Sequence, residues 1–108
     1  MATEITALLS GATTTGAGVY VRLDPGVKTF QVYGTTTSGA GSATVKIQGS
    51  NDGLAWDDID AGMSLTLATT LSSTSSDSYT SDDRYAYHRA NVTAISGTGA
   101  RVSGGVSQ

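Results

Sequence analysis

The residue of this sequence that is best suited to acid–base catalysis is its single histidine, His88. His88 follows two aspartates, Asp82 and Asp83, and serine is abundant, so the parts of a Ser-His-Asp site are present. Such a site needs a positioned nucleophile, and no Gly-x-Ser-x-Gly turn occurs. His88 instead alternates with Ala86 and Ala90 along one face of an expected strand. We therefore expect a histidine of the core or of a subunit contact, without a catalytic role.

Three neighbouring carboxylates form the second candidate site. Asp57, Asp58 and Asp60 offer the oxygen ligands that calcium prefers. The spacing departs from an EF-hand loop, because Gly62 comes one position early and no glutamate closes the loop. Zinc would need histidine or cysteine ligands, and the chain has one histidine and no cysteine. We expect a solvated acidic turn with no metal or other cofactor, and a bound cation is the alternative.

Aromatic and arginine side chains supply the candidates for binding. Trp56 follows a turn, where it either closes one end of the core or forms a ligand platform, for which Tyr79 is a second candidate. Tyr87 and Arg89 lie two residues apart, on the same face of one expected strand. They form either an internal stacked pair or, with His88, part of a contact with a neighbouring subunit.

Charge and hydropathy exclude several classes of partner. The net charge is −3, and the six basic residues are scattered, so the basic patch of a nucleic-acid-binding protein is missing. Residues 47–83 hold seven aspartates and neither lysine nor arginine. No apolar run reaches the length of a membrane span. The first residues do not resemble a signal peptide, so we expect synthesis in a cytoplasm.

The elements that must position these residues are strands. Of 108 residues, 31 are serine or threonine and 14 are glycine, a composition that favours half-solvated strands over helices. Apolar residues alternate with polar ones in several runs separated by turn signals, such as Asp24-Pro25-Gly26 and Asn51-Asp52-Gly53. The expected strands are 19–23, 27–34, 42–49, 54–59, 64–71, 85–96 and 101–106.

This spacing of strands predicts an all-β fold: one antiparallel β-sandwich, similar to a jelly roll, over residues 1–108. Residues 72–83 are expected to form a polar loop with a short edge strand. The three Gly-x-Gly sequences at 16–18, 39–41 and 97–99 are expected at hairpin tips. Residues 1–18 and 104–108 are candidates for extended arms that become ordered on a neighbouring subunit.

Two phrases of the sequence resemble a known group of proteins. Residues 47–56 contain Gly-Ser-Asn-Asp-Gly followed, after two intervening residues, by Trp56, and residues 85–100 read Tyr-x-Tyr-x-Arg-Ala-Asn-Val-Thr-x-Ile-Ser-Gly-Thr-Gly-Ala. Their order and spacing are similar to those of small β-sandwich proteins encoded among the structural genes of tailed bacteriophages, over about residues 8–103. The same phrases resemble, over about half of the chain, galactose-binding-like sandwiches of the discoidin type.

The phage resemblance implies a non-enzymatic virion protein on the capsid surface. It would be a capsid decoration (cement) protein, with the major capsid protein and neighbouring copies of itself as partners, as a trimer or dimer. A head-to-tail or tail-associated protein is a close alternative. The second resemblance implies a carbohydrate-binding module for host attachment, although the chain lacks the cysteine pair and the aromatic-tipped loops of many such domains.

Overall fold

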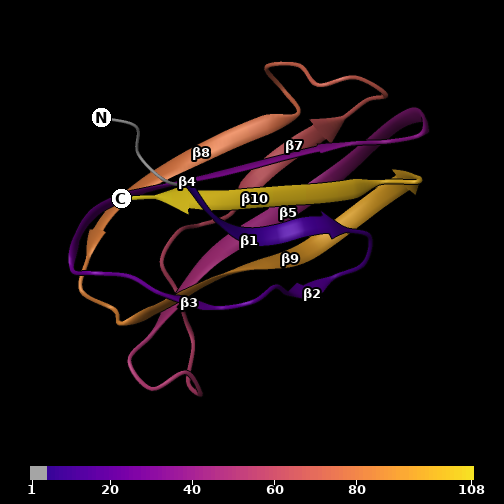
Figure 1. Cartoon of the computed structure of the whole chain (residues 1–108). Coiled ribbons are helices and arrows are strands. Elements are labelled where there is room, and N and C mark those ends of the chain that lie inside the picture. The colour runs from indigo at the N-terminus through magenta and orange to yellow at the C-terminus, as the bar shows by residue number, and fades with distance from the viewer. Residues whose placement is uncertain (1–4) are drawn as a thin grey trace.

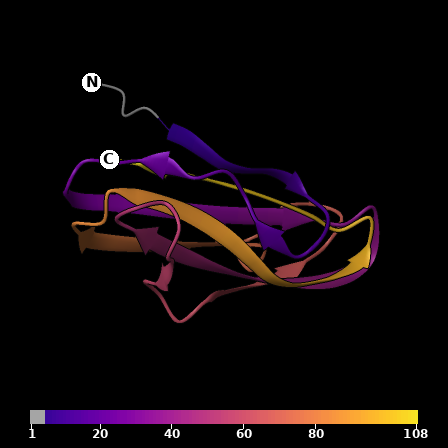
Figure 2. The same ribbon diagram turned by 90° about the horizontal axis from the view of Figure 1, so that it is seen from below.

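The computed structural model describes residues 5–108, which form ten strands and no helix. The strands make two antiparallel sheets that stack face to face, as the ribbon in Figure 1 and the perpendicular view in Figure 2 show. The extents of this slab are 40 × 34 × 20 Å. The expectation of an all-β antiparallel sandwich is confirmed.

The first sheet, sheet A, contains four strands in the order β1-β10-β4-β8. Its strands are β1 (Ile5–Ala12), β4 (Gly26–Thr35), β8 (Ser76–Asp83) and β10 (Arg101–Ser107). The pairing of β4 with β8 is unbroken from Gly26 opposite Asp83 to Tyr33 opposite Ser76. This register sets Phe30 opposite Tyr79, so the two sheet neighbours present aromatic rings to the same face.

The second sheet, sheet B, is built on the central pair β5 and β9. Its strands are β2 (Gly16–Ala17), β3 (Val21–Arg22), β5 (Ser38–Ser50), β6 (Asp57–Asp58), β7 (Met63–Leu67) and β9 (Tyr87–Thr98). The short strands β2 and β3 both pair with the edge of β9 that faces away from β5. On the other side, β6 and β7 both pair with the edge of β5 that faces away from β9. Each pair of short strands therefore acts as one interrupted edge strand.

If β2 with β3 and β6 with β7 are each counted as one strand, the sandwich has eight strands, numbered here 1 to 8 along the chain. Their order is 1-8-3-6 in sheet A and 2-7-4-5 in sheet B. Successive strands cross from one sheet to the other, except for the hairpin from β5 to β6 and β7. This double Greek-key arrangement is that of a jelly roll. The topology identifies the fold, but a fold alone does not specify an activity, so a function has to be inferred from the side chains that the fold positions.

The core lies between the sheets and comes from strict alternation. Every second residue is buried in β7, in β10, over residues 28–34 of β4 and over residues 43–49 of β5, as expected for strands with one wet face. The buried apolar side chains include Leu8, Leu9, Phe30, Val32, Ala43, Val45, Ile47, Met63, Leu65, Leu67, Ala90, Val92, Val102 and Val106. The face that we expected for residues 43, 45 and 47 is therefore confirmed.

The predicted face of β9 is correct only for its first half. His88, Ala90 and Val92 are buried, but Ala94 is exposed and Ile95 is partly buried. The register explains the change, since Thr44 pairs with Ala94 while Val45 pairs with Val92. Thr93 is the additional residue of a β-bulge, and a one-residue insertion exchanges the faces beyond it. Ala94 therefore does not share the apolar face that the sequence pattern predicts.

The first and last strands of the described part of the chain, β1 and β10, lie in sheet A. Residues 5–12 form β1, which pairs with β10, and β10 continues to Ser107. Consecutive Leu8 and Leu9 are both buried because the register shifts between Ala7 and Leu9. Residues 1–4 lie outside the described part of the chain. Over residues 5–18 and 104–107 the structure contains paired strands and their connection, and exchange of either end with a neighbouring copy stays a prediction.

Two further expectations about connections need correction. Residues 72–83, expected as a polar loop with a short edge strand, do contain an edge strand of sheet A, but this strand, β8, is longer than expected at eight residues, because pairing with β4 outweighs its polar composition. Of the Gly-x-Gly sequences, 97–99 forms the β9–β10 turn and 39–41 begins β5 beside it, where a Cβ on Gly97 would lie 2.9 Å from the Cα of Gly41. Residues 16–18 instead follow the edge of β9.

Candidate functional site

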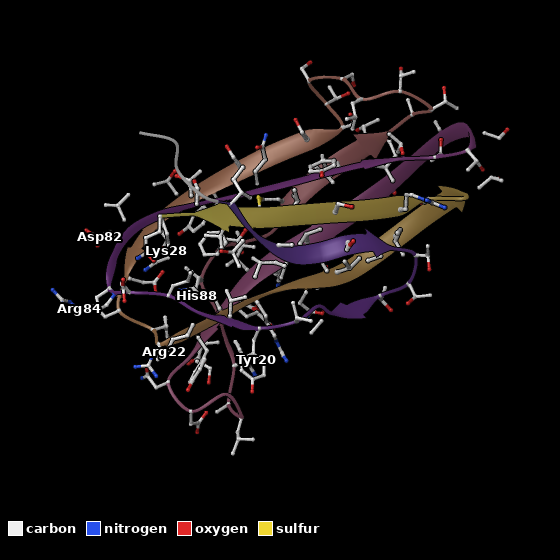
Figure 3. All side chains as sticks on the ribbon, viewed as in Figure 1. Tyr20, Arg22, Lys28, Asp82, Arg84 and His88 are labelled. Carbon is white, nitrogen blue, oxygen red and sulfur yellow. The ribbon has the colours of Figure 1, made fainter. Side chains whose placement is uncertain are left out.

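The first group of functional residues is a polar network inside the sandwich, made of Lys28, Ser81, Asp83 and His88. The network forms because side chains alternate between the two faces of each strand. Lys28 lies on the inward face of β4, and Ser81 and Asp83 lie on the inward face of β8. His88 is the first inward-facing residue of β9. The side chains of Lys28 and His88 are completely buried. Figure 3 shows both of them near the end of the slab where β4 begins.

Asp83 is the centre of this network. Its Oδ1 lies 2.7 Å from Nε2 of His88, its Oδ2 accepts a 2.6 Å hydrogen bond from the Ser81 hydroxyl, and its backbone carbonyl accepts one from Nζ of Lys28 at 2.9 Å. The Lys28 ammonium is 3.6 Å from Oδ1. Through its carboxylate and its backbone carbonyl, Asp83 therefore provides partners for groups on three strands of both sheets, as the buried charge of Lys28 requires.

The ionisation of this network follows from its burial. Burial by itself would raise the pKa of Asp83, but the hydrogen bonds from Ser81 and His88 outweigh it, so the pKa lies below its ordinary value of 3.8. Burial lowers the pKa of His88 below 6.5, despite the opposing attraction of Asp83. His88 is accordingly neutral at pH 7, and its Nε2 carries the hydrogen donated to the Asp83 carboxylate.

The His88–Asp83 pair has the form of a catalytic dyad but not its access. In such a dyad the second imidazole nitrogen faces a nucleophile or substrate. Nδ1 of His88 is buried and, within residues 5–108, has no hydrogen-bond partner. The pair links β9 to the end of β8 inside the protein. His88 is thus a core residue, and it is separated from the exposed face on which Tyr87 and Arg89 lie.

The second group lies on the outer face of sheet B, and we call it the aromatic–arginine cluster: Tyr20, Arg22, Trp56, Tyr87 and Arg89. Two Tyr-x-Arg triplets, residues 20–22 and 87–89, run antiparallel, with Arg22 directly opposite Tyr87. The ring of Tyr20 makes an edge contact with Tyr87 at a centroid distance of 5.5 Å and a tilted contact with Trp56 at 5.7 Å. Trp56 reaches this face from the loop between β5 and β6.

Both arginines of the cluster stack on aromatic rings. The guanidinium carbon of Arg89 lies 4.3 Å from the ring centroid of Trp56, and that of Arg22 lies 6.0 Å from the centroid of Tyr87. Arg89 also donates through Nε to the side-chain oxygen of Gln48 at 2.8 Å. These contacts hold the long side chains in fixed positions, which lowers the entropy that binding a partner would cost.

A polar row continues from the cluster to the far edge of the sheet. Gln48 donates to Oδ1 of Asp58 at 2.9 Å, and Lys46 donates to Oδ2 at 3.3 Å. These hydrogen bonds lower the pKa of Asp58 below 3.8, with that of Gln48 as the largest cause. The row therefore runs from Arg22 on the edge strand β3 to Asp58 on the edge strand β6.

The acidic stretch is used for hydrogen bonds and loop structure. Asp60 accepts the backbone N–H of Ile47 at 2.7 Å. Asp52 accepts the N–H groups of Ala55 and Leu54, which lower its pKa and order the tip of the 51–56 loop. Within residues 5–108, no three histidine or acidic side chains lie close enough together to hold a metal ion. In that part of the chain, no helix is long and apolar enough to cross a membrane.

The structure brings together three of the residues selected from the sequence and separates the others. Trp56, Tyr87 and Arg89 share the aromatic–arginine cluster. Tyr79 lies on β8 of the other sheet, packs against the core and donates its hydroxyl to the Ile59 carbonyl at 3.3 Å, so it does not join that surface. Trp56 is half-buried on the outer face of sheet B rather than at one end of the core.

Sequence reasoning missed Tyr20 and Lys28. The repeated Tyr-x-Arg pattern was the available signal for Tyr20, since two such triplets on neighbouring strands place like residues on one face. Lys28 alternates with Phe30 and Val32, which is the position of a core residue. Nothing local distinguishes it from an edge lysine, because its partner Asp83 comes from 55 residues away.

Comparison with protein-family models, with curated proteins and with solved structures gave no match.

Proposed function

We propose that this chain is a non-enzymatic binding protein of a tailed-phage virion, a decoration (cement) protein of the outer capsid lattice. The observation that carries the proposal is the aromatic–arginine cluster on a rigid jelly roll. Tyrosine, tryptophan and arginine are the residue types that dominate the energetic centres of protein interfaces. Here they are exposed or half-exposed on one sheet face and held by mutual stacking. The resemblance of residues 47–56 and 85–100 to phage structural proteins supports the virion assignment.

The mechanism of such a protein is thermodynamic linkage. A protein that binds the assembled shell and not its free subunits stabilises the shell by mass action, and repeated contacts over the lattice add avidity. Two edge strands of sheet A, β1 and β8, present backbone groups that no neighbour in residues 5–108 pairs. We propose these edges as capsid contacts in addition to the aromatic–arginine cluster, because unpaired strand edges readily add a strand from another chain.

The direct test is the copy number in purified virions of the phage that encodes this chain, measured by quantitative mass spectrometry. Hundreds of copies per particle, together with a lower disruption temperature in particles that lack the protein, are expected for a decoration protein. About a dozen copies or fewer would place it at the neck or tail instead. Absence from the particle would overturn the proposal.

Carbohydrate binding is the second candidate, and the exposed ring of Tyr20 beside Trp56 is the observation that favours it. Sugars stack on open aromatic faces, but one face of Trp56 is already occupied by the Arg89 guanidinium. Titration with host surface polysaccharide while Trp56 fluorescence is recorded distinguishes the two candidates. A saturable change that is lost in Tyr20→Ala would favour the sugar module over the virion contact.

A further inference from the structure

We propose that the aromatic–arginine cluster binds a protein surface that presents carboxylate side chains, and that the guanidiniums of Arg22 and Arg89 recognise those carboxylates. This inference rests on the proposed function, because it takes the capsid shell as the protein that carries the carboxylates. Three features carry it: two arginines without an acidic partner, their stacking on aromatic rings, and the small extent of the positive area that they form.

The arginines of the cluster have no acidic partner within residues 5–108. Both lysines of the chain form ion pairs with aspartates, whereas no arginine in that part of the chain lies within 4.0 Å of a carboxylate. Acidic residues nevertheless outnumber basic residues, by nine to six. The charges of Arg22 and Arg89 are therefore available to another molecule, and the complementary partner is an anion.

Stacking on aromatic rings prepares both guanidiniums for this contact. The guanidinium carbon of Arg89 lies 4.3 Å from the ring centroid of Trp56, and that of Arg22 lies 6.0 Å from the centroid of Tyr87. Stacking occupies the face of a guanidinium and leaves the N–H groups along its edge for in-plane hydrogen bonds, which is the geometry of a bidentate contact with a carboxylate. Because Arg89 uses Nε for its hydrogen bond to Gln48, the amino groups at the end of its guanidinium are those that remain for a partner.

Tyr20 joins the two stacked pairs into one surface. Its ring contacts Trp56 at a centroid distance of 5.7 Å and Tyr87 at 5.5 Å. Figure 3 shows the side chains of Tyr20 and Arg22 on the same side of the chain segment that carries them. One partner surface can therefore cover both guanidiniums and the aromatic ring between them.

Apolar side chains are exposed around the cluster. Tyr20 is 55% exposed, its neighbour Val19 is 65% exposed, and Leu54, in the loop that carries Trp56, is 85% exposed. Exposed apolar side chains that gather in one place mark surfaces that another molecule covers. When they are covered, water is excluded from the charged groups beside them, which strengthens a contact between guanidinium and carboxylate. The surface thus matches a partner whose carboxylates lie among apolar side chains.

The positive area is small, and acidic side chains lie close to it. Gln48 connects Arg89 to the exposed Asp58, and the exposed Asp52 lies in the loop that carries Trp56. A continuous polyanion that crossed the cluster would also meet these carboxylates, and like charges that are brought together disfavour such a partner. A few carboxylates held in fixed positions on a folded protein can meet the guanidiniums alone. The surroundings therefore favour a protein as the source of the anion.

Binding of the full chain to virions that lack it tests this inference. Such particles come from the encoding phage after deletion of the gene for this chain, and co-sedimentation gives the dissociation constant. We expect wild type to bind, and to bind more weakly as salt is added, because surface charge pairs are screened. Arg22→Gln and Arg89→Gln should each weaken binding at least about tenfold, as expected for arginines at the centre of an interface.

Arg101→Gln is the matched control for these substitutions. Arg101 also lacks a carboxylate partner, but it lies on β10 of sheet A and has no aromatic ring beneath its guanidinium, so its replacement should leave binding unchanged. Circular dichroism of each variant must retain the β-sheet spectrum. Arg22→Lys keeps the charge and loses the planar guanidinium, so it should restore only part of the binding that Arg22→Gln loses.

Amidation of the particles tests the chemistry of the partner. Treatment of the same virions with a carbodiimide and a neutral amine converts exposed carboxylates to uncharged amides, and electron microscopy verifies that the shells stay intact. Wild type should bind the amidated particles at least about tenfold more weakly. Arg22→Gln should lose less than wild type, because a contact that is already absent cannot be removed again. Acetylation of the particle lysines is the control and should leave wild-type binding unchanged.

The possible results separate the two proposals. A wild type that neither binds these particles nor occurs in virions overturns the decoration role and the carboxylate contact together. Binding that neither the arginine substitutions nor amidation weakens leaves the decoration role and overturns the carboxylate contact. A loss in the arginine variants without a loss on amidated shells places another group opposite the guanidiniums and also overturns it. Binding of an acidic host polysaccharide that depends on Arg22 and Arg89 assigns the guanidiniums to a sugar and overturns the protein partner.

Discussion

Nε2 of His88 lies 2.7 Å from Oδ1 of Asp83, and this hydrogen bond joins the first residues of β9 in one sheet to the last residue of β8 in the other. The same carboxylate faces the buried ammonium of Lys28 from β4. One end of the sandwich is therefore held together by charge and hydrogen bonds, whereas the middle is held by aliphatic packing.

Replacement of Asp83 by asparagine should destabilise the protein by about 3 kcal/mol, since removal of one member of a buried ion pair leaves the other charge uncompensated. Lys28 would then be a completely buried cation beside neutral neighbours. Urea unfolding followed by circular dichroism measures the loss. Asp82→Asn, one residue earlier and exposed, is the matched control and should change the free energy of unfolding by less than about 0.5 kcal/mol. Equal effects of the two substitutions would show that the network contributes nothing.

Stability should fall as the pH is lowered from 7 to 5. The pKa of His88 is below 6.5 in the folded protein, so the unfolded chain takes up a proton first and is favoured as the pH drops through this range. The lowered pKa of Asp83 adds a second loss below about pH 3.8, where the unfolded carboxylate becomes protonated. Urea titrations at several pH values measure both losses. His88→Gln should flatten the curve between pH 7 and 5, and a wild-type stability that rises over this range would contradict the argument.

Because of the bulge at Thr93, Ile95 and not Ala94 faces the core, which is the opposite of what uninterrupted alternation of faces along β9 would give. Ile95 packs against the core although it lies in the expected outward phase, so Ile95→Ala should cost roughly 1–2 kcal/mol for a half-buried side chain. Ala94 is exposed, and Ala94→Thr should change stability by less than about 0.5 kcal/mol. Thermal unfolding of the two variants distinguishes the registers. If Ala94→Thr were the damaging change, the alternation would continue without a bulge.

Trp56 should report on its contact with Arg89. The guanidinium covers one face of the indole ring at 4.3 Å, so Arg89→Ala should expose the ring, shift its emission to longer wavelength and increase quenching by acrylamide. Arg101→Ala, on the other sheet, is the control that should leave the spectrum unchanged. An unaltered spectrum in Arg89→Ala would show that the stacking does not persist in solution.

Part of the site was predictable because it depends on local alternation. Tyr87 and Arg89 occupy one face of β9 by period two alone, and the Asn51-Asp52-Gly53 turn places Trp56 in the loop of the β5–β6 hairpin. The meeting of Trp56 with Arg89 was not predictable. It requires β5 to pair with both β6 and β9, and β9 contributes from more than thirty residues further along the chain.

The sequence by itself determined the class of fold and the faces of most strands, because alternation of apolar and polar residues is a property of near neighbours. It also determined that the chain has few reactive side chains, with one histidine and no cysteine. Only the tertiary structure decided that Lys28 is buried, that the edge strand ending at Asp83 is eight residues long, and that Tyr20 and Arg22 lie beside Tyr87. Each of these depends on register between distant strands, and a shift of one residue would turn every side chain involved to the opposite face.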